Sequence, residues 1–486
     1  MYVPFVGYAP DADATTPGVL VSVTNMVPTE RGLAGAPGAA EAVTGLAALA
    51  SDCRGAAALV NTLGIRRNIA GTQTKLYEIS GSTWADVSRV GDYTGSSENR
   101  WMFAQFGNAA LASNDTEVIQ ASTSGAFADI ATAPKARIIV AAKDFVLAFN
   151  TNDGTYGDSP DRWWCSQFQD HSTWTISVPN QANTGRLVGA QGEITAAANL
   201  GALVVAYKAR GMYLGQYVGS PIVWQWDQVP GEVGCVGPEA VVDIGGAHIF
   251  IGEDNIWQFD GTRPIPIATG VIRQAFFDDG SATYRYRAMV NYDRQKSLVW
   301  IFYASSNSTT GIADRAIVYN LVSKTWGRAD MTAQAVVNFI VPGITWDTLD
   351  TVATTWETLP DLPWDSQAWQ AGGRALAVFN ASNQLRTLTG SSTGGSITTG
   401  DYGSDAQVSY SPEVRLRYLT APTSATATGY TRQVMGGALT TNSTVTQADG
   451  KLDIRQSGRW HRYSVTFTGG VEVTGIDLKM QAAGAR

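Results

Sequence analysis

Short segments in which apolar and polar residues alternate run through most of the chain. Clear examples lie at Arg137–Phe149, Leu203–Tyr207, Ala247–Ile251 and Ser297–Tyr303. A period of two is typical of a strand with one buried face, because successive side chains point to opposite sides of the sheet. Gly, Ser, Asn and Asp, which favour tight turns, separate many of these segments. The pattern therefore predicts an all-β protein.

A degenerate repeat recurs between about residues 55 and 390. Each copy has an apolar pair, a polar residue, another apolar residue, a turn, and then an aromatic and polar run. Clear copies lie at Leu76–Trp84, Ile256–Arg263 and Ile317–Trp326, and weaker ones at Val118–Phe127, Met212–Trp226 and Leu385–Gly390. Recurrence at roughly 40–60 residues is typical of β-propeller blades with about four strands each. We expect about six blades, with five and seven as alternatives.

The repeat divides the chain into four parts. Residues 1–50, rich in Pro, Ala and Gly, predict an extended arm with one short helix at Ala39–Ala50. Residues 51–390 form the predicted propeller. Residues 391–404, rich in Gly and Ser, predict a linker or an exposed hairpin. Residues 405–486 predict a C-terminal antiparallel β domain that joins the N-terminal arm.

Composition agrees with this architecture and limits the function. Of the 486 residues only 16% are charged, while Gly contributes 51 and Trp 15, which favours strands and turns over helices. The helix at Gly270–Asp279, apolar on one face, is an exception that we expect to bridge two blades. A net charge of −8 argues against a protein that grips nucleic acid through its phosphates. The longest apolar stretch, near Leu200–Tyr207, is too short to span a membrane, and no secretory signal is expected.

Cysteine and histidine are sparse and widely spaced. Cys53, Cys165 and Cys235 form no C-x-x-C pair, which predicts buried free thiols. Cys165 precedes His171 by six residues, a pair that could act as a thiol nucleophile and its base. The favoured interpretation is a blade strand with a buried cysteine, because no third orienting group stands out. His248 and His461 complete the histidines, and no metal site or cofactor is predicted.

A Trp-rich insertion at 344–370 interrupts the predicted propeller. Its repeated Trp-acid-Thr/Ser unit carries Asp347, Glu357 and Asp365, and carboxylates beside Trp could cleave or bind sugars or hold Ca²⁺. Pro360 and Pro363 make the run loop-like, so these carboxylates lack a fixed spacing and no enzyme activity is predicted. We expect its Trp side chains to contact a neighbouring subunit, since Trp is a frequent interface anchor. These are Trp346, Trp356, Trp364 and Trp369.

The last segment, Gly450–Arg486, is the most distinctive. Short alternating stretches broken by Gly flank Gly-Arg-Trp-His-Arg-Tyr, and the chain ends at Ala-Gly-Ala-Arg. This ending resembles the C-terminus of the tail nozzle proteins of short-tailed bacteriophages, also called tail tubular protein B. The opening segment Asn25–Gly38 and the strand segment Arg162–Trp174 are similar to other parts of that family.

The resemblance implies a structural virion protein of the phage tail, made in the host cytoplasm. The family forms a hexameric ring that joins the head-to-tail adaptor, and its lumen is the exit path that retains and then releases the genome. DNA would pass transiently without specific binding. Docking of a tail fibre or spike stays open, because this chain is shorter than the larger members. An alternative is a receptor-binding, glycan-binding or glycan-cleaving propeller tail protein.

The C-terminal residues are candidates for contacts with the adaptor or a neighbouring copy. Residues 405–486 contain nine Arg and Lys but only six Asp and Glu. This excess of positive charge is consistent either with a docking face or with ordinary strand surface. The candidate interface residues here are Arg455, Arg459, Trp460, His461 and Arg486.

Overall fold

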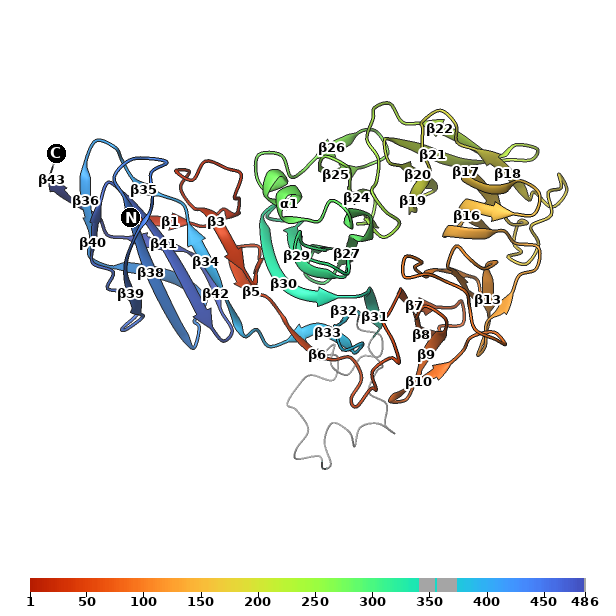
Figure 1. Ribbon diagram of the computed structural model, residues 1–486, viewed down its shortest axis with the longest axis horizontal. Helices are drawn as coiled ribbons and strands as arrows, with labels where there is room; N and C mark the ends of the chain where they lie inside the picture. Colours follow the sequence, from red (N-terminus) through yellow and green to blue (C-terminus); the bar gives the residue numbers. More distant parts are fainter. Residues whose placement is uncertain (341–354, 356–373, 485–486) are drawn as a thin grey trace.

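The computed structural model describes residues 1–340, 355 and 374–484. These residues form many strands and two short helices, α1 (Arg273–Asp279) and η1 (Arg285–Arg287), so the fold is all-β as predicted. None of the described helices is long and apolar enough to cross a membrane. Two parts lie along the long axis of the molecule, a propeller and a smaller β-sandwich (Figure 1).

Four-stranded antiparallel blades make up the propeller, and the first four follow one another along the chain. Blade 1 contains β7 (Ala56–Val60), β8 (Arg66–Gly71), β9 (Leu76–Ser80) and β10 (Thr83–Asp86). Blade 2 contains β11 (Met102–Phe106), β12 (Ala109–Ser113), β13 (Gln120–Ser122) and β14 (Ala128–Asp129). Blade 3 contains β15 (Lys135–Ala142), β16 (Phe145–Asp153), β17 (Gly157–Cys165) and β18 (Asn183–Arg186). Blade 4 contains β19 (Ile194–Leu200), β20 (Leu203–Lys208), β21 (Gly211–Gly219) and β22 (Val223–Gln228).

Three further blades complete the circle. Blade 5 contains β23 (Val241–Asp243), β24 (His248–Ile251), β25 (Ile256–Phe259) and β26 (Pro264–Pro266). Blade 6 contains β27 (Met289–Asp293), β28 (Leu298–Tyr303), β29 (Ala313–Asn320) and β30 (Trp326–Ala333). Blade 7 contains β31 (Val336–Ile340), β32 (Arg374–Phe379), β33 (Leu385–Gly390) and, from the N-terminal arm, β6 (Gly38–Glu41). Each inner strand contacts the inner strand of the next blade, and β31 returns to β7.

The blade count in the described part of the chain is seven, rather than the six that six repeat copies suggested. Those copies fall at or near the third and fourth strands of every blade except blade 3. There, residues 166–182 separate β17 from β18, so no short hairpin marks the blade in the sequence. The helix expected between two blades is present as α1, which lies between β26 and β27.

The N-terminal arm is built into the sheets. Instead of a helix near Ala39–Ala50, residues 38–41 form β6, with Ala40 opposite Thr387 of β33. The pairing closes blade 7, and Glu41 lies 3.3 Å from Arg386. Pairing with the edge of β33 outweighs the helix propensity of this Ala-rich segment, which Val43, Thr44 and Gly45 interrupt.

The β-sandwich combines both ends of the chain. One sheet has the order β2 (Gly7–Tyr8), β3 (Val19–Thr24), β34 (Gly394–Thr399), β41 (Trp460–Thr468), β38 (Ser424–Arg432) and β39 (Thr440–Thr446), with β35 (Tyr402–Gly403) also on β41. In the other, β42 (Glu472–Leu478) pairs with β37 (Val414–Thr420), β1 (Tyr2–Pro4) and β5 (Leu33–Gly35), and β4 (Met26–Pro28) continues it into β30 of blade 6. A small sheet of β40 (Gln456–Gly458), β36 (Val408–Ser411) and β43 (Gln481–Gly484) lies at the C-terminal end.

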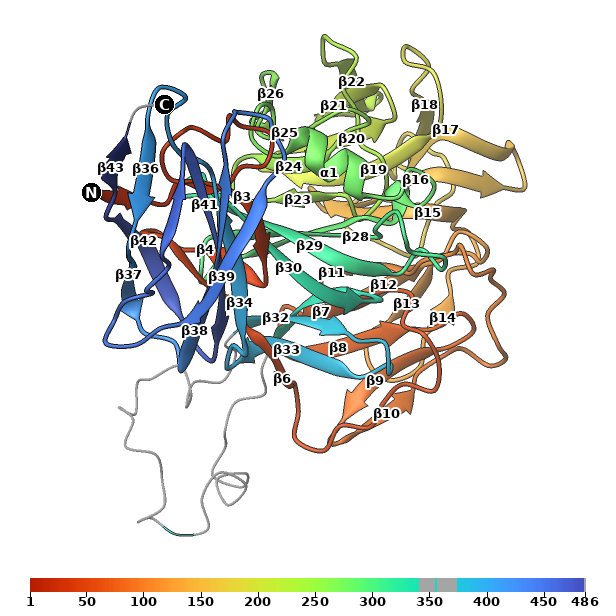
Figure 2. The same ribbon diagram turned by 60° about the vertical axis from the view of Figure 1, so that its left-hand side comes forward.

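Residues 391–404 are therefore neither a linker nor an exposed hairpin. Their central part, β34, pairs with β3 on one side and β41 on the other, and Ile397 is fully buried. Nor is the C-terminal region separate from the propeller, because one apolar cluster joins Phe467 of the sandwich to Trp326 and Phe250 of the blades. Figure 2 shows the blue C-terminal strands beside the red N-terminal strands.

Candidate functional site

Several candidate residues lie outside the described part of the chain. The Trp-rich insertion and its acids fall there, as does the last residue: Trp346, Asp347, Trp356, Glu357, Trp364, Asp365, Trp369 and Arg486. The candidate site that can be built from contacts is therefore the Gly-Arg-Trp-His segment, together with the mouth of the propeller axis.

His461 has an internal position. Its side chain is fully buried, with the Ser409 hydroxyl 2.9 Å from Nε2 and the Gln456 amide nitrogen 3.1 Å from Nδ1. Burial lowers the pKa of His461 below the ordinary value for histidine. The imidazole holds β36, β40 and β41 together, so it cannot itself touch a partner in this conformation.

Trp460, the preceding residue, faces a surface hollow. Its indole Nε1 donates a hydrogen bond of 2.7 Å to Asp405, which fixes the ring. The hollow has a volume of about 640 Å³ and is lined by residues from both ends of the chain, including Met1, Tyr402 and Met480. Arg455 is exposed and Arg459 is partly exposed. Trp460 and the two arginines thus remain accessible for contacts, in contrast to His461.

Most basic residues of the C-terminal region form ion pairs with carboxylates of the same chain. The buried Asp401 carboxylate forms ion pairs with Arg432 and, at 2.8 Å, with Arg462. Arg417 pairs with Asp477 at 2.7 Å. Of the nine basic residues, six form ion pairs in the described part of the chain: Arg415, Arg417, Arg432, Lys451, Arg462 and Lys479. The count of charges therefore overstates the basic surface.

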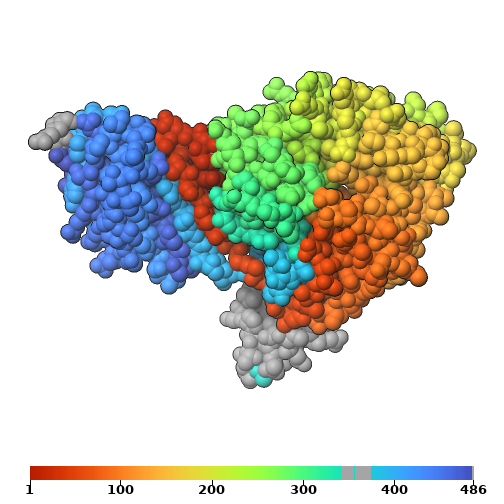
Figure 3. Space-filling model, viewed as in Figure 1, coloured from red at the N-terminus to blue at the C-terminus, as the bar shows by residue number. Residues whose placement is uncertain are grey.

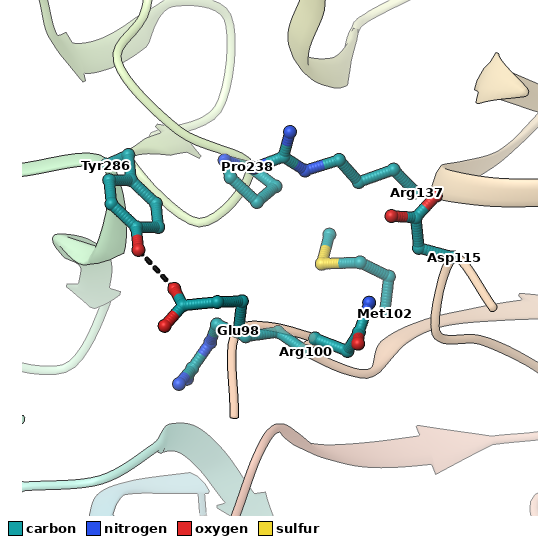
Figure 4. Close-up of a pocket in the computed structure, with 8 residues that line it drawn as sticks. Glu98, Arg100, Met102, Asp115, Arg137, Pro238 and Tyr286 are labelled. Carbon is teal, nitrogen blue, oxygen red and sulfur yellow. Dashed lines mark hydrogen bonds between the residues drawn. The ribbon is translucent and has the colours of Figure 1, made fainter. Parts of the chain in front are cut away.

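A second site lies where the blades meet at the propeller axis. A cavity of about 310 Å³ is lined by residues from blades 2, 3, 5 and 6, among them Glu98, Arg100, Asp115, Arg137 and Tyr286. In Figure 4, Glu98 points toward Tyr286, while Asp115 and Arg137 lie on the opposite side of the cavity.

Arg100 connects one side of the axis to the other. Its guanidinium pairs with Glu239 of the segment before blade 5 and donates a 3.1 Å hydrogen bond to the Gln334 carbonyl, before blade 7. Glu98 makes a second connection, because its carboxylate accepts hydrogen bonds from Tyr286 and, at 2.5 Å, from Arg287. These contacts cross this end of the axial shaft beside the cavity.

The pKa values of the two carboxyl groups in the cavity lining shift in opposite directions. Hydrogen bonds from Arg287 and then Tyr286 lower the pKa of Glu98. Burial raises the pKa of Asp115, while the nearby Arg137 acts in the opposite direction. Asp115 also has a positive φ of 72°, which Asp tolerates better than most residues.

The sequence did not predict this network of charged residues at the propeller axis, although the chain carries a pattern that marks several of them. In six of the seven described blades a charged or amide residue stands one or two positions before the inner strand. These residues are Arg54, Arg100, Glu193, Glu239, Arg287 and Gln334. Finding the pattern requires the strand starts, which the degenerate repeat does not locate.

Cys165 does not form a nucleophilic pair with His171. The thiol is fully buried on β17, where it contacts the Gln181 carbonyl at 3.5 Å, and burial raises its pKa to about 12. The His171 ring packs against Phe106 at 5.9 Å between centroids. The described residues also contain no group of three His, Cys, Asp or Glu side chains that could hold a metal ion.

Comparisons with known proteins give no family. No family model and no curated protein matches the chain. Among solved structures, the computationally designed Ika8 protein is similar at a TM-score of 0.35 and 11% identity, covering 71% of this chain and 98% of its own. YCF48 bound to D1 peptide scores 0.33 at 15% identity, covering 60% and 86%. A chain of the mitotic checkpoint complex scores 0.38 at 8% identity, covering 71% and 92%.

Proposed function

We propose that this chain is a subunit of a ring-shaped tail nozzle in a short-tailed phage, a structural protein that retains the genome and then releases it. The supporting observation joins sequence and structure. Two of the segments that resemble the nozzle family, Asn25–Gly38 and Gly450–Arg486, come from opposite ends of the chain but pair directly. Leu33 of β5 lies opposite Val473 of β42. These two segments thus form one contiguous piece of the fold, while the third similar segment, Arg162–Trp174, begins in β17 of blade 3.

The path of the DNA follows from the closed axis. A cavity of about 310 Å³ is the size of a small-molecule pocket and far too small for a duplex. Arg100 and Glu239 also bridge the shaft. The exit channel of the proposed nozzle therefore lies between copies arranged in a ring, and not along the axis of any one propeller.

Surface charge favours sliding over binding. Each Lys or Arg that neutralises a phosphate adds affinity through counterion release, which would slow a passing duplex. The net charge is −8, and most C-terminal basic residues are held in internal ion pairs. We propose that loop closure, rather than phosphate binding, retains the genome, and that the adaptor ring binds near Trp460.

The test is genetic and structural. Phage lacking this gene should package DNA but lose it from particles without a nozzle, and the wild-type gene supplied in trans should restore filled, infectious particles. Electron microscopy of the two populations reads out the tail directly. Particles that keep a complete nozzle and their DNA without this chain would refute the proposal.

A glycan-cleaving propeller is the alternative that the axial cavity brings to mind. Glycosidases need two available carboxyls. The described lining includes Glu98 and Asp115, but both oxygens of Glu98 are already engaged by Arg287 and Tyr286. Depolymerisation of host surface glycans by the purified protein, abolished in Asp115→Asn, would favour this alternative over the nozzle.

A further inference from the structure

Most outer strands of the propeller have features that disfavour pairing with a strand of another chain. An exposed edge strand can add a foreign strand unless it is short or carries charges or Pro. Five described outer strands have two to four residues, and each carries a charge or Pro: β6, β10, β14, β18 and β26. The outer strand of blade 6 is covered, because β30 pairs with β4.

Two free edges depart from this rule. Strand β39, with the sequence Thr-Thr-Asn-Ser-Thr-Val-Thr, has seven residues, no charge and no Pro, and it ends its sheet. Strand β22 has six residues, Val-Trp-Gln-Trp-Asp-Gln, whose one charge, Asp227, lies next to its end. By comparison β37, as long as β39, carries Arg415 and Arg417.

Exposed aliphatic side chains flank both edges. Val434 and Leu439, which precede β39, are 62% and 38% exposed. Val218 and Ile222, at the turn into β22, are 44% and 59% exposed. A strand added to either edge would cover these side chains as well as satisfy a row of backbone groups.

We propose that β39 of one copy pairs with β22 of the next copy, joining the chains head to tail. This inference rests on the proposed ring and names its contact. The two edges lie toward opposite ends of the long axis, β39 in the sandwich and β22 in blade 4 (Figures 1 and 3). A contact between different surfaces is heterologous, and only such contacts generate a ring with more than two copies around one axis.

The chemistry of the two strands is compatible. The Thr side chains of β39 are exposed and Trp226 of β22 is partly exposed, and cross-strand pairs of aromatic and β-branched residues stabilise sheets. Ser443 on β39 and Gln225 on β22 are both exposed and uncharged. Strand β39 has no charge to desolvate and β22 has only Asp227 near its end, whereas the other free outer strands of the propeller are short and carry a charge or Pro.

The test uses two lysine variants of the full chain. Ser443→Lys places a positive charge on the edge of β39, and Gln225→Lys places one on the edge of β22. Both replaced side chains are exposed. Ala128→Lys on β14, an edge that already carries the charge of Asp129, is the matched control. Circular dichroism and melting temperature verify folding, and native mass spectrometry and sedimentation velocity measure the assembly.

Wild type and the β14 control should assemble. Each edge variant alone should dissociate, with association weakened by roughly tenfold or more, because an ammonium group would lose its water against an uncharged strand. An equimolar mixture of the two edge variants should form a dimer and stop there, because each copy keeps one intact edge. Edge variants that assemble like wild type, a mixture that stays monomeric, or a wild type that never assembles would overturn the inference.

The outcome is separable from that of the proposed function. If both edge variants still build normal nozzles on particles, the β39–β22 contact is refuted while the nozzle stands. If the mixture forms the dimer but particles keep a complete nozzle without this gene, the contact stands and the nozzle function is refuted.

Discussion

The propeller blades are antiparallel, and so is the sandwich apart from the parallel pair β2–β3, but the two parts take their strands from the chain in different ways. Blades 1 to 6 each consist of four consecutive strands, so their pairings are local in sequence. In the sandwich, β42 pairs with β1 and β5 near the N-terminus and with β37 near the C-terminus. The Met1 amino group even donates a 2.7 Å hydrogen bond to the Leu478 carbonyl. The sandwich therefore forms only when both ends of the chain are present, whereas each of blades 1 to 6 takes all four strands from one continuous segment.

This difference assigns distinct roles to the two parts. Local hairpins close quickly, while distant strands must first overcome the entropy of closing a long loop. The shared apolar cluster then couples the sandwich to blades 5 and 6. We expect the sandwich to form after the blades and then to stabilise the propeller against which it packs.

The largest effect is expected on removing residues 460–486. The truncation deletes β41 and β42, which are interior strands of the two sandwich sheets. Both sheets lose their centres, so the chain should be insoluble or should unfold with the propeller destabilised as well. A chain ending at Met480 loses only β43 of the described strands and is the control, which should melt within a few degrees of wild type. If the truncated chain still shows an unfolding transition of the propeller like that of wild type, the propeller does not depend on the sandwich. That result would contradict the stabilising role of the sandwich.

A smaller effect is expected from the buried ion pairs of the sandwich. Asp401→Ala leaves Arg432 and Arg462, both largely buried, without their shared carboxylate, which should cost about 3–5 kcal/mol of unfolding free energy. In the propeller, Asp161→Ala removes an ion pair with Arg186, whose side chain is 56% exposed, and should cost about 0–1 kcal/mol. Chemical denaturation measures the unfolding free energy that each variant loses. Equal losses in the two variants would contradict the expected difference between the sandwich and the propeller.

Acid should weaken both parts through one histidine each. Burial lowers the pKa of His461 in the sandwich and of His248 in blade 5 below the unfolded value. Below about pH 6.5 the unfolded chain therefore binds protons that the folded chain does not, and stability falls as pH falls. His461→Asn and His248→Asn should each flatten the decline in unfolding free energy between about pH 7.5 and 5.5. A decline that stays as steep as in wild type in both variants would contradict this assignment.

The smallest expected signal is the reactivity of the thiols, all of which lie in the propeller region. Cys53, Cys165 and Cys235 are fully buried or nearly so, and burial raises the pKa of each to about 12. At pH 8 the folded protein should show no fast-reacting thiol, and all three should react after denaturation. A thiol that reacts at once in the native protein would reveal an open blade.

The same contrast explains what the sequence could predict. Alternation and turn residues located the hairpins of most blades, because those signals are local. Strand β34, with two Gly and few apolar residues, has no strand signal of its own, and its partners β3 and β41 lie far away in sequence. The same holds for β6, whose partner β33 is more than 300 residues away. His461 and the axial Arg100 were similarly beyond prediction, since their environments depend on segments brought together by the fold.

Reconstruction of the assembled protein by electron microscopy tests the proposed ring most directly. We expect a ring of six copies, with an open bore between subunits, the sandwich of each copy against blade 4 of the next, and every propeller axis closed by Arg100 and Glu239. Isolated monomers under all conditions, or a channel that runs through the propeller axis itself, would contradict it.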